Sequence, residues 1–154
     1  NAEAIAGAGY ATSAFDGSAN AIDWARRRFP ASEVDYRVAD LLRLPDEWDG
    51  YFDLVHECYT VQSVPPPLHE EMIRAIAALV APGGTLLVYT RVRPDGSAVD
   101  GPPWPLTETE TRLFAACGLD CASGERFDLV RDDGTLSPHL FAVWRRPAGE
   151  GRDD

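Results

Sequence analysis

The sequence predicts an α/β fold with a mostly parallel sheet and an antiparallel hairpin at its C-terminal end. The first observation is the order of features in residues 51–90, where an apolar run, three prolines, an amphipathic segment and a second apolar run follow one another. This is the order of a strand–helix–strand crossover, which builds parallel sheets. A similar order of strand, helix and strand occupies residues 10–38. Near the end, the tight turn at 132–134 joins two strand-like segments, which must then be antiparallel.

The first third of the chain predicts a short helix and then one strand–helix–strand unit. Residues 2–8 favour a helix through their alanine content, and glycines end it. A strand is expected over residues 10–15 and a helix over residues 18–29, with a serine at the N-cap and a proline after the end. Residues 33–38 alternate between apolar and polar side chains, as in a half-exposed strand near a sheet edge. One face of that strand is expected to hold Val34, Tyr36 and Val38.

The middle of the chain predicts two buried strands joined by a helix. The stretches FDLV and TLLVYT place the strands at residues 52–57 and 85–90, and the first is expected to be buried on both faces. Prolines at 65–67 precede the helix, and the Pro-Gly-Gly segment at 82–84 ends it. The apolar stripe of the helix is expected to comprise Leu68, Met72, Ile76, Leu79 and Val80.

The last third predicts a loop, a helix and the hairpin. Residues 91–105 are rich in proline, and a long loop in a compact domain is usually functional. A helix over residues 107–116 begins with threonine followed three residues later by glutamate, which is a capping box. Strands over residues 119–130 and 139–145 form the hairpin, and residues 147–154 are expected to be a disordered tail.

Charge and composition narrow the function classes. The formal net charge is −11 and every basic residue is arginine, so a phosphate backbone would be repelled and no nucleic-acid partner is expected. No apolar run approaches the roughly 20 residues of a membrane-spanning helix, so no membrane partner is expected. The three cysteines form no CxxC pair and suit buried thiols in a cytoplasmic protein. His56, His69 and His139 lack metal-ligand spacing, which predicts no metal site.

Four segments resemble the class I S-adenosylmethionine-dependent methyltransferases, in the same order along the chain. They are YATSAFDGSANAIDWARRRFP, YRVADLLRLP, FDLVHECYTVQSVPP and LVAPGGTLLVYT, which are similar to the family's second strand and helix, third strand, fourth strand and fifth-strand junction. The resemblance extends from about residue 7 to residue 146, and the C-terminal hairpin matches as well. It implies a Rossmann-like doubly wound sheet, a partial methyltransferase domain over residues 1–146, and S-adenosylmethionine as the cofactor.

One departure from the family is large. The family's first strand, with its acidic residue and glycine-rich loop around the methionine part of the cofactor, has no counterpart before Tyr10. We therefore expect either that the sequence begins inside the domain or that the domain is degenerate. In the first case, the coding sequence upstream of Asn1 is expected to hold an apolar strand, an acidic residue and a Gly-x-Gly loop. A chain without that strand is expected to bind the cofactor poorly and to have weak or no activity.

The resemblance assigns cofactor contacts to the residues that end the first two strands. Asp16, followed by Gly17, corresponds to the acid that accepts hydrogen bonds from both ribose hydroxyls, a task that suits two carboxylate oxygens. Asp40 corresponds to the residue that accepts from the adenine amine, and Leu41 to the apolar neighbour that packs on the ring. Simpler roles stay open, because Asp16 could help to cap the following helix and Asp40 could form an Asx-turn.

The resemblance also places the end of the fourth strand near the reacting groups. His56 is expected to contact the cofactor, and Glu57 and Tyr59 are expected to face the acceptor. Trp104 in the long loop could cover a ligand or simply anchor the loop. Methyl transfer depends mainly on orientation, and it needs a base only where the acceptor must lose a proton. Glu57 or His56 could be that base or could be structural, so no catalytic residue is assigned.

The acceptor is expected to be a small molecule. The segment after the fourth strand reads HECY and lacks the Asn/Asp-Pro-Pro-Tyr signature of amino-group methylation on nucleic acid or protein. Two alternatives are kept. The chain could be a degenerate methyltransferase-like binding domain without activity, because the glycine-rich loop is missing. It could also be a nucleotide-cofactor oxidoreductase, since Asp16 would bind a ribose there too, although Asp40 and the terminal hairpin argue against this.

Overall fold

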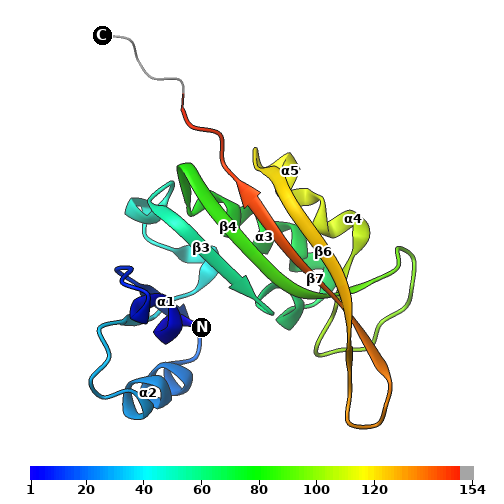
Figure 1. Cartoon of the computed structure of the whole chain (residues 1–154), viewed down its shortest axis with the longest axis horizontal. Helices are drawn as coiled ribbons and strands as arrows, with labels where there is room; N and C mark the ends of the chain where they lie inside the picture. Colours follow the sequence, from blue (N-terminus) through cyan, green and yellow to red (C-terminus); the bar gives the residue numbers. More distant parts are fainter. Residues whose placement is uncertain (150–154) are drawn as a thin grey trace. The chain divides into compact units, whose positions relative to one another are not determined.

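The computed structural model describes residues 1–149 and divides into two compact units, Asn1–Leu44 and a second that begins at Pro45. The first contains α1 (Ala2–Gly7), β1 (Ser13–Asp16), α2 (Ala19–Arg28), β2 (Asp35–Val38) and the 3₁₀ turn η1 (Leu41–Arg43). The second contains η2 (Asp46–Trp48), β3 (Phe52–Cys58), η3 (Val61–Ser63), η4 (Pro66–Leu68), α3 (His69–Ala78), β4 (Val80–Arg93), β5 (Leu106–Thr107), α4 (Glu108–Thr111), α5 (Leu113–Ala116), β6 (Asp120–Val130) and β7 (Leu136–Arg145) (Figure 1).

The first unit is the predicted strand–helix–strand arrangement. β1 and β2 pair in parallel, with Asp16 beside Val38, and Ser18 caps α2 as expected. β1 begins at Ser13, later than the predicted residue 10. Along the predicted apolar face, Val34 is buried and Tyr36 is half-buried, whereas Val38 is 52% exposed. The reason is that Val38 is the last residue of a four-residue strand.

The interior of the first unit is small. Its buried apolar side chains are Ile22, Val34 and Leu41. The helix α1 is fastened by Glu3, whose carboxylate accepts a hydrogen bond from the Tyr36 hydroxyl at 2.7 Å. Three buried side chains are few for an independent core, so polar contacts of this kind contribute to holding α1 in place.

The second unit is a five-stranded sheet. Its strand order is β3-β4-β7-β6, and β5 pairs with β4. β3 and β5 run parallel to β4, whereas β7 runs antiparallel to both β4 and β6. The predicted α/β class, with parallel strand pairs and a C-terminal antiparallel hairpin, is therefore confirmed. Within residues 1–149, β3 is an edge strand that pairs with β4 alone.

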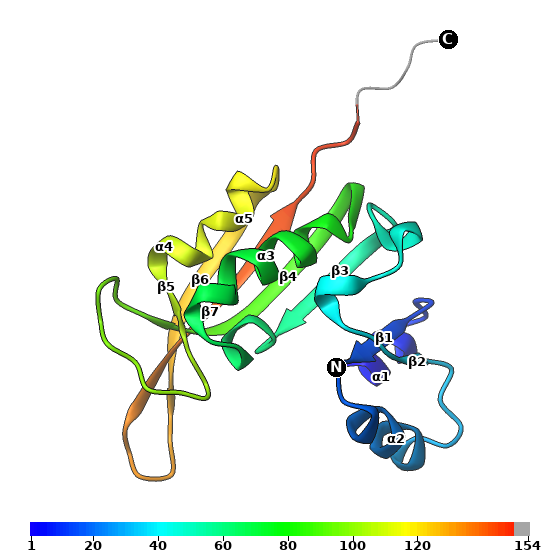
Figure 2. The ribbon, with the colours of Figure 1, turned by 180° about the vertical axis from the view of Figure 1, so that it is seen from behind.

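Helices α3, α4 and α5 lie on one face of this sheet (Figure 2). Burial along β4 alternates accordingly: Leu86, Val88 and Thr90 are buried, whereas Leu87 and Tyr89 between them are half-buried. The prediction that the strand at residues 52–57 is buried on both faces is wrong, because Glu57 is the one fully buried residue of β3. One face is covered by helices, and the other keeps part of its surface accessible.

β4 is longer than predicted and begins irregularly. It starts at Val80, which pairs with Phe52, so the Pro-Gly-Gly segment belongs to the strand and does not follow the helix as a separate turn. A Cβ atom on Gly84 would lie 2.8 Å from the carbonyl oxygen of Ala81 and 3.0 Å from that of Phe52. The close backbone approach at this irregularity therefore requires a glycine.

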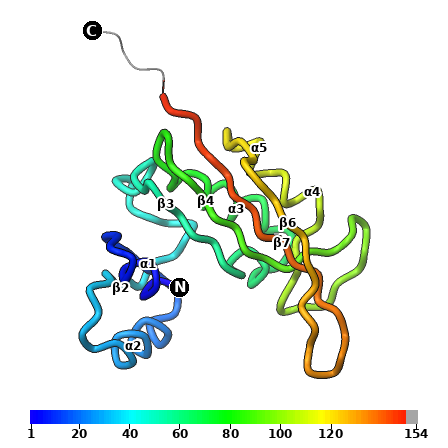
Figure 3. Tube along the Cα trace, viewed as in Figure 1, coloured from blue at the N-terminus to red at the C-terminus, as the bar shows by residue number. Residues whose placement is uncertain are grey.

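Three other boundaries differ from the predictions. α3 begins at His69, so Leu68 lies outside the helical stripe and is 39% exposed. The helix expected over residues 107–116 is interrupted at Arg112 and forms α4 and α5. β7 begins at Leu136, and its hairpin with β6 extends out from the sheet (Figure 3).

The predicted capping box at the start of α4 also joins two helices. Thr107 and Glu110 cap each other's backbone groups as expected. The Glu110 carboxylate lies 2.9 Å from Nδ1 of His69, whose Nε2 lies 2.9 Å from the carbonyl oxygen of Val64. His69 is fully buried, so both ring nitrogens are used inside the fold and link α3 to α4.

In residues 1–149, every helix is too short or too polar to cross a bilayer. Residues 147–149 form neither helix nor strand. The remainder of the predicted disordered tail, residues 150–154, lies outside the described part of the chain.

Candidate functional site

Two predicted cofactor residues meet at the carboxyl edge of the first unit. β1 and β2 are parallel neighbours, and the N–H of Ala39 donates to the carbonyl of Asp16 at 3.1 Å, so Asp16 and Asp40 follow adjacent strand ends. Ligands of open α/β sheets bind beyond such ends. Gly17 is exposed beside Asp16, and a Cβ there would approach the Ala39 carbonyl only to 3.9 Å. Gly17 is therefore not required by packing.

Both carboxylates also have a local structural role. Oδ1 of Asp16 accepts from the N–H of Ser18 at 2.7 Å, and Oδ1 of Asp40 accepts from the N–H of Leu42 at 3.0 Å. Each Asp is exposed, so its second oxygen can take a further donor, although that of Asp40 already lies 3.9 Å from Nε of Arg43. Leu41 is only 8% exposed.

In the second unit, the predicted residues lie at the carboxyl end of β3. His56 aligns with Leu87 of β4 on the face that the helices do not cover, and it is half-buried. Burial lowers the pKa of His56, because the charged imidazolium loses hydration. A neutral imidazole at this place can accept or donate one hydrogen bond, and it can contact a ligand without adding charge.

Glu57 points to the opposite, helix-covered side and is 2% exposed. Its Oε1 accepts from the N–H groups of Thr60 at 2.8 Å and Val61 at 3.2 Å, whereas Oε2 is buried and has no partner within residues 1–149. Burial raises the pKa of Glu57 to about 7, against the opposing effect of those two hydrogen bonds. The carboxyl group is therefore partly protonated near pH 7. Its two hydrogen bonds hold the backbone that follows β3.

Tyr59 follows β3 and reaches across the sheet to β7. Its hydroxyl lies 2.8 Å from Nε2 of His139, and its ring lies edge-on to Tyr89 with centroids 5.2 Å apart. His139 is 2% exposed, and Phe127 of β6 stacks on it at 5.8 Å. The end of β3 is thus surrounded by aromatic side chains from three other strands or loops.

Trp104 lies in the long loop and is tied to the same region. Its backbone N–H donates to the carbonyl of Gln62 at 2.8 Å, and its half-buried ring stands against Gly101, where a Cβ would lie only 2.5 Å from ring carbons. Both contacts anchor the loop. They also hold the loop beside the chain that leaves β3.

Three further residues of this edge are not identified by the sequence alone: Gln62, Arg91 and His139. Oε1 of the buried Gln62 accepts from the Arg91 N–H at 2.9 Å and from the Thr90 hydroxyl at 3.2 Å. Arg91 aligns with His139 across the β4–β7 pair. The available signal for His139 was its position at the start of the last strand, because an antiparallel strand begins where its parallel neighbours end.

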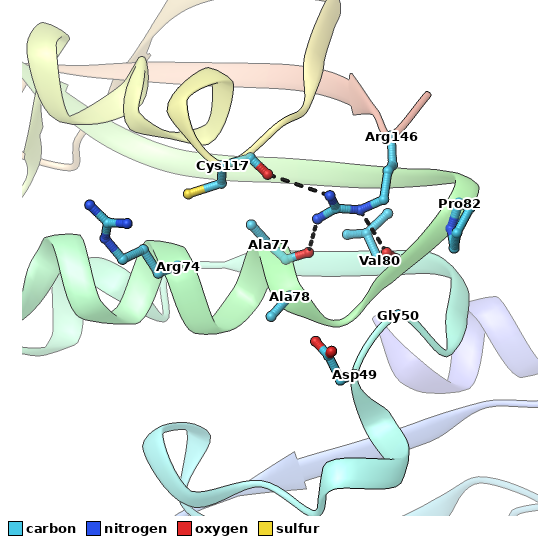
Figure 4. Close-up of a pocket in the computed structure, with 9 residues that line it drawn as sticks. All are labelled: Asp49, Gly50, Arg74, Ala77, Ala78, Val80, Pro82, Cys117 and Arg146. Atoms are coloured by element: carbon cyan, nitrogen blue, oxygen red, sulfur yellow. Dashed lines mark hydrogen bonds between the residues drawn. The ribbon is translucent and has the colours of Figure 1, made fainter. Parts of the chain in front are cut away.

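A hollow of about 440 Å³ lies at the other end of β4 and is large enough for a small ligand (Figure 4). Its main cation is already engaged, because Arg146 donates to the carbonyls of Ala77 and Val80 at 2.8 Å and of Cys117 at 3.4 Å. Arg74, also on its wall, pairs with Glu70. Burial raises the pKa of the Cys117 thiol, which keeps it a poor nucleophile. The hollow is therefore a packing feature.

No cluster of three or more His, Cys, Asp or Glu side chains able to hold a metal occurs in residues 1–149. The three cysteines, all within that range, form no disulfide bond with one another. The chemistry available at the described strand ends is thus that of carboxylates, imidazoles, phenols and one guanidinium.

Comparison with known proteins identifies the family. The family model described as "Methyltransferase domain" matches residues 1–84, which is more than half of the chain. The chain belongs to this family. The match to the methyltransferase domain includes the strand ends that carry Asp16, Asp40 and His56.

Curated relatives match a shorter segment of the methyltransferase domain. The ubiquinone biosynthesis O-methyltransferases of Xanthomonas campestris pv. campestris are 45% identical to it over 58 residues. That segment covers 38% of this chain and 23% of those relatives, so the match spans less than a quarter of their length.

Solved structures of methyltransferases share the fold of this chain over nearly the whole of its length. An S-adenosylmethionine-dependent methyltransferase of Methanosarcina mazei superposes with a TM-score of 0.77 at 15% identity, covering 95% of this chain and 86% of its own. A second similar structure is the 1,6-didemethyltoxoflavin-N1-methyltransferase of Burkholderia thailandensis, solved with bound 1,6-didemethyltoxoflavin and S-adenosylhomocysteine. It superposes with a TM-score of 0.67 at 17% identity, and the match covers 94% of this chain and 64% of that enzyme. The predicted class I methyltransferase family and Rossmann-like fold are thereby confirmed, and S-adenosylmethionine is the cofactor of that family.

Proposed function

We propose that this methyltransferase domain serves an enzyme that transfers a methyl group from S-adenosylmethionine to a small-molecule acceptor in the cytoplasm. The observation that carries the proposal is the pair of exposed carboxylates, Asp16 and Asp40, at adjacent strand ends of a chain that belongs to a methyltransferase family. When bound, the cofactor supplies an activated methyl group. The protein's own contribution is to bind, orient and enclose the reactants.

The residues of the first unit fit the adenosine part of the cofactor to different degrees. Asp16 fits well, because one carboxylate oxygen remains for the ribose hydroxyls after the other accepts from Ser18. Asp40 fits the adenine amine in the same way. Leu41 fits less well, because its side chain is 8% exposed and can offer only an edge to the ring. His56 is proposed as a further contact, with Tyr59 and Trp104 on the acceptor side. The sequence predicts that Glu57 faces the acceptor too, but it is 2% exposed on the helix-covered side and holds the chain after β3.

A small-molecule acceptor is supported by two observations. The chain after β3 reads HECY, without the signature of nucleic-acid or protein amino methylation. Two of the matched proteins are named for ubiquinone biosynthesis and for 1,6-didemethyltoxoflavin.

Calorimetric titration of the full-length protein with S-adenosylhomocysteine and with NADH tests the function. We expect binding of S-adenosylhomocysteine alone, and we expect Asp16→Asn to weaken it about 30-fold, since two charge-assisted hydrogen bonds lose strength. Asp23→Asn, an exposed change on α2, is the matched control and should leave the affinity unchanged. Binding of NADH alone would favour the oxidoreductase alternative, and binding of neither ligand would contradict both enzyme functions.

A further inference from the structure

Tyr59 has a strained backbone at the point where β3 ends. Among residues 1–149 it is the non-glycine residue with a positive φ, 64°. A side chain in this left-handed region costs about 1 kcal/mol, so the surrounding structure must hold it there. The hydrogen bond from its N–H to the carbonyl of Tyr89, at 3.1 Å, provides part of that support. Strain of this kind concentrates at functional sites, which directs attention to what the Tyr59 side chain does.

The hydroxyl of Tyr59 is bonded to a histidine whose tautomer is fixed. Nδ1 of His139 lies 2.6 Å from the carbonyl oxygen of Ser137, and a carbonyl can only accept, so Nδ1 carries the proton. Nε2 then presents its lone pair to the Tyr59 hydroxyl at 2.8 Å. A neutral imidazole oriented by a third group is the arrangement of a proton acceptor. The phenol oxygen of Tyr59 keeps lone pairs for another hydroxyl.

A positive charge adjoins this pair. Arg91 stands opposite His139 in the sheet register, and its Nε is buried without a partner in the described chain. The pKa of Tyr59 rises to about 12, first through burial and then through Tyr89 and Cys58, while the charge of Arg91 acts in the opposite direction. Tyr59 is therefore a neutral donor. Arg91 would stabilise an anionic oxygen beside Tyr59 and would repel an ammonium group.

The surroundings are aromatic as well. The ring centroids of Tyr89 and Phe127 lie 5.6 Å and 5.8 Å from that of His139. Tyr59, Tyr89 and Phe127 each keep part of their surface accessible. Such rings suit a planar partner, which can pack edge-on or offset against them.

We propose that Tyr59 and His139 take the proton of a phenolic acceptor and that Arg91 stabilises the phenolate. The proton of the acceptor hydroxyl passes to Oη of Tyr59 while the proton of Tyr59 passes to Nε2 of His139. The electron pair of the broken O–H bond stays on the acceptor oxygen, and the resulting phenolate would be the nucleophile for the methyl group that the cofactor supplies when bound. This inference rests on the proposed methyl transfer and deepens it by naming the acceptor class and the proton path.

The test uses the full-length protein and two probes, phenol as acceptor and 4-nitrophenol as a spectroscopic reporter of ionisation. We expect Tyr59→Phe to lower kcat for phenol about 100-fold while KM changes less than about twofold. With S-adenosylhomocysteine present, bound 4-nitrophenol should ionise at a lower pH than the free probe. Arg91→Met should abolish that shift without any turnover being required.

Tyr51→Phe is the matched control, because Tyr51 is 68% exposed and stands before β3, and it should leave both readouts unchanged. Thermal melting and S-adenosylhomocysteine affinity confirm that each variant is folded. Full activity of Tyr59→Phe, an unshifted nitrophenol, or transfer to benzylamine in place of phenol would overturn the proposal while leaving the methyltransferase function intact. Failure of the unmodified protein to bind S-adenosylhomocysteine would instead overturn the proposed function, and this inference with it.

Discussion

The two ends of the second unit's strands use polar side chains in opposite ways. At the amino end of β4, Arg146 donates to three backbone carbonyls, so its hydrogen-bonding capacity is spent on the fold. Two of the three buried side-chain atoms without partners in residues 1–149, Oε2 of Glu57 and Nε of Arg91, lie at the carboxyl end, where Tyr59 also holds a strained backbone. The third is Nε1 of Trp144 in β7. Unsatisfied buried groups cost stability, and in natural proteins they call for a functional explanation.

The difference teaches that a hollow is a weaker indicator of function than an unsatisfied group. The space beside Arg146 is large enough for a ligand, yet both arginines that line it, Arg74 and Arg146, already have partners. At the aromatic end of β3, Glu57 and Arg91 each have a buried polar atom that lacks a hydrogen-bond partner in residues 1–149. We therefore expect substitutions at the amino end of β4 to reduce the free energy of unfolding. Substitutions at the carboxyl end of β3 should instead change how stability depends on pH and how the protein binds ligands.

The largest stability effect is expected for Arg146→Met. The substitution leaves three carbonyls at the ends of α3 and α5 without their donor, and hydrogen bonds to a charged group contribute about 1.5–3 kcal/mol each. Because these bonds share one side chain, we expect a total loss of about 4 kcal/mol in the free energy of unfolding, measured by urea denaturation. Arg145→Met, an exposed neighbour, should cost little. Equal losses of stability in the two variants would show that the three hydrogen bonds of Arg146 do not stabilise the fold as proposed.

The next effect concerns the pH dependence of Glu57. Its pKa is raised from 4.5 to about 7 in the folded protein, so the folded state holds the proton more tightly than the unfolded chain. The resulting stability is fully present below pH 4.5 and is lost as the pH rises through about 7, which amounts to roughly 3 kcal/mol.

Glu57→Gln should remove that part of the pH dependence. Denaturation curves across the range should show the unmodified protein losing stability relative to the variant as the pH rises. Glu71→Gln, an exposed change on α3, should leave the slope as it is. A slope that survives in the Glu57 variant would mean that another group titrates.

The smallest of the three effects is expected for Gly84→Ala. The new methyl group would meet the carbonyl oxygens of Ala81 and Phe52 at 2.8 Å and 3.0 Å, and backbone can move away only by distorting the start of β4. Overpacking of this size costs about 2 kcal/mol. In Gly124→Ala the nearest atom is 3.9 Å away, so this control should be neutral in the same thermal melt. A neutral Gly84 variant would show that the amino end is more adaptable than its saturated hydrogen bonds suggest.

Much of the fold follows from local patterns. The Ser18 cap, the Thr107–Glu110 box and the crossover between β3 and β4 were all predictable, because each depends on residues close together in sequence. The start of β4 was not, since Pro-Gly-Gly is typical of a helix end, and only pairing of Val80 with Phe52 makes it part of a strand.

The residues of the candidate site likewise fall into those that local sequence patterns predict and those that only the three-dimensional structure brings together. Asp16, Asp40 and His56 could be named because each lies at or near the carboxyl end of a recognisable strand. His139 could not be linked to Tyr59, because the two lie 80 residues apart and meet only through the register of β7 against β4. Arg91 could not be predicted either, because the sequence does not show that its Nε is buried without a hydrogen-bond partner in residues 1–149.

The single paired edge of β3 has a consequence for handling the protein. Along Phe52–Cys58, the backbone N–H and C=O groups that point away from β4 form a template that any extended peptide can join. The second unit on its own should therefore tend to pair with a second copy through β3 at high concentration. Its solubility would depend on whatever covers that seven-residue border, which makes β3 a structural weak point as well as a support for the proposed site.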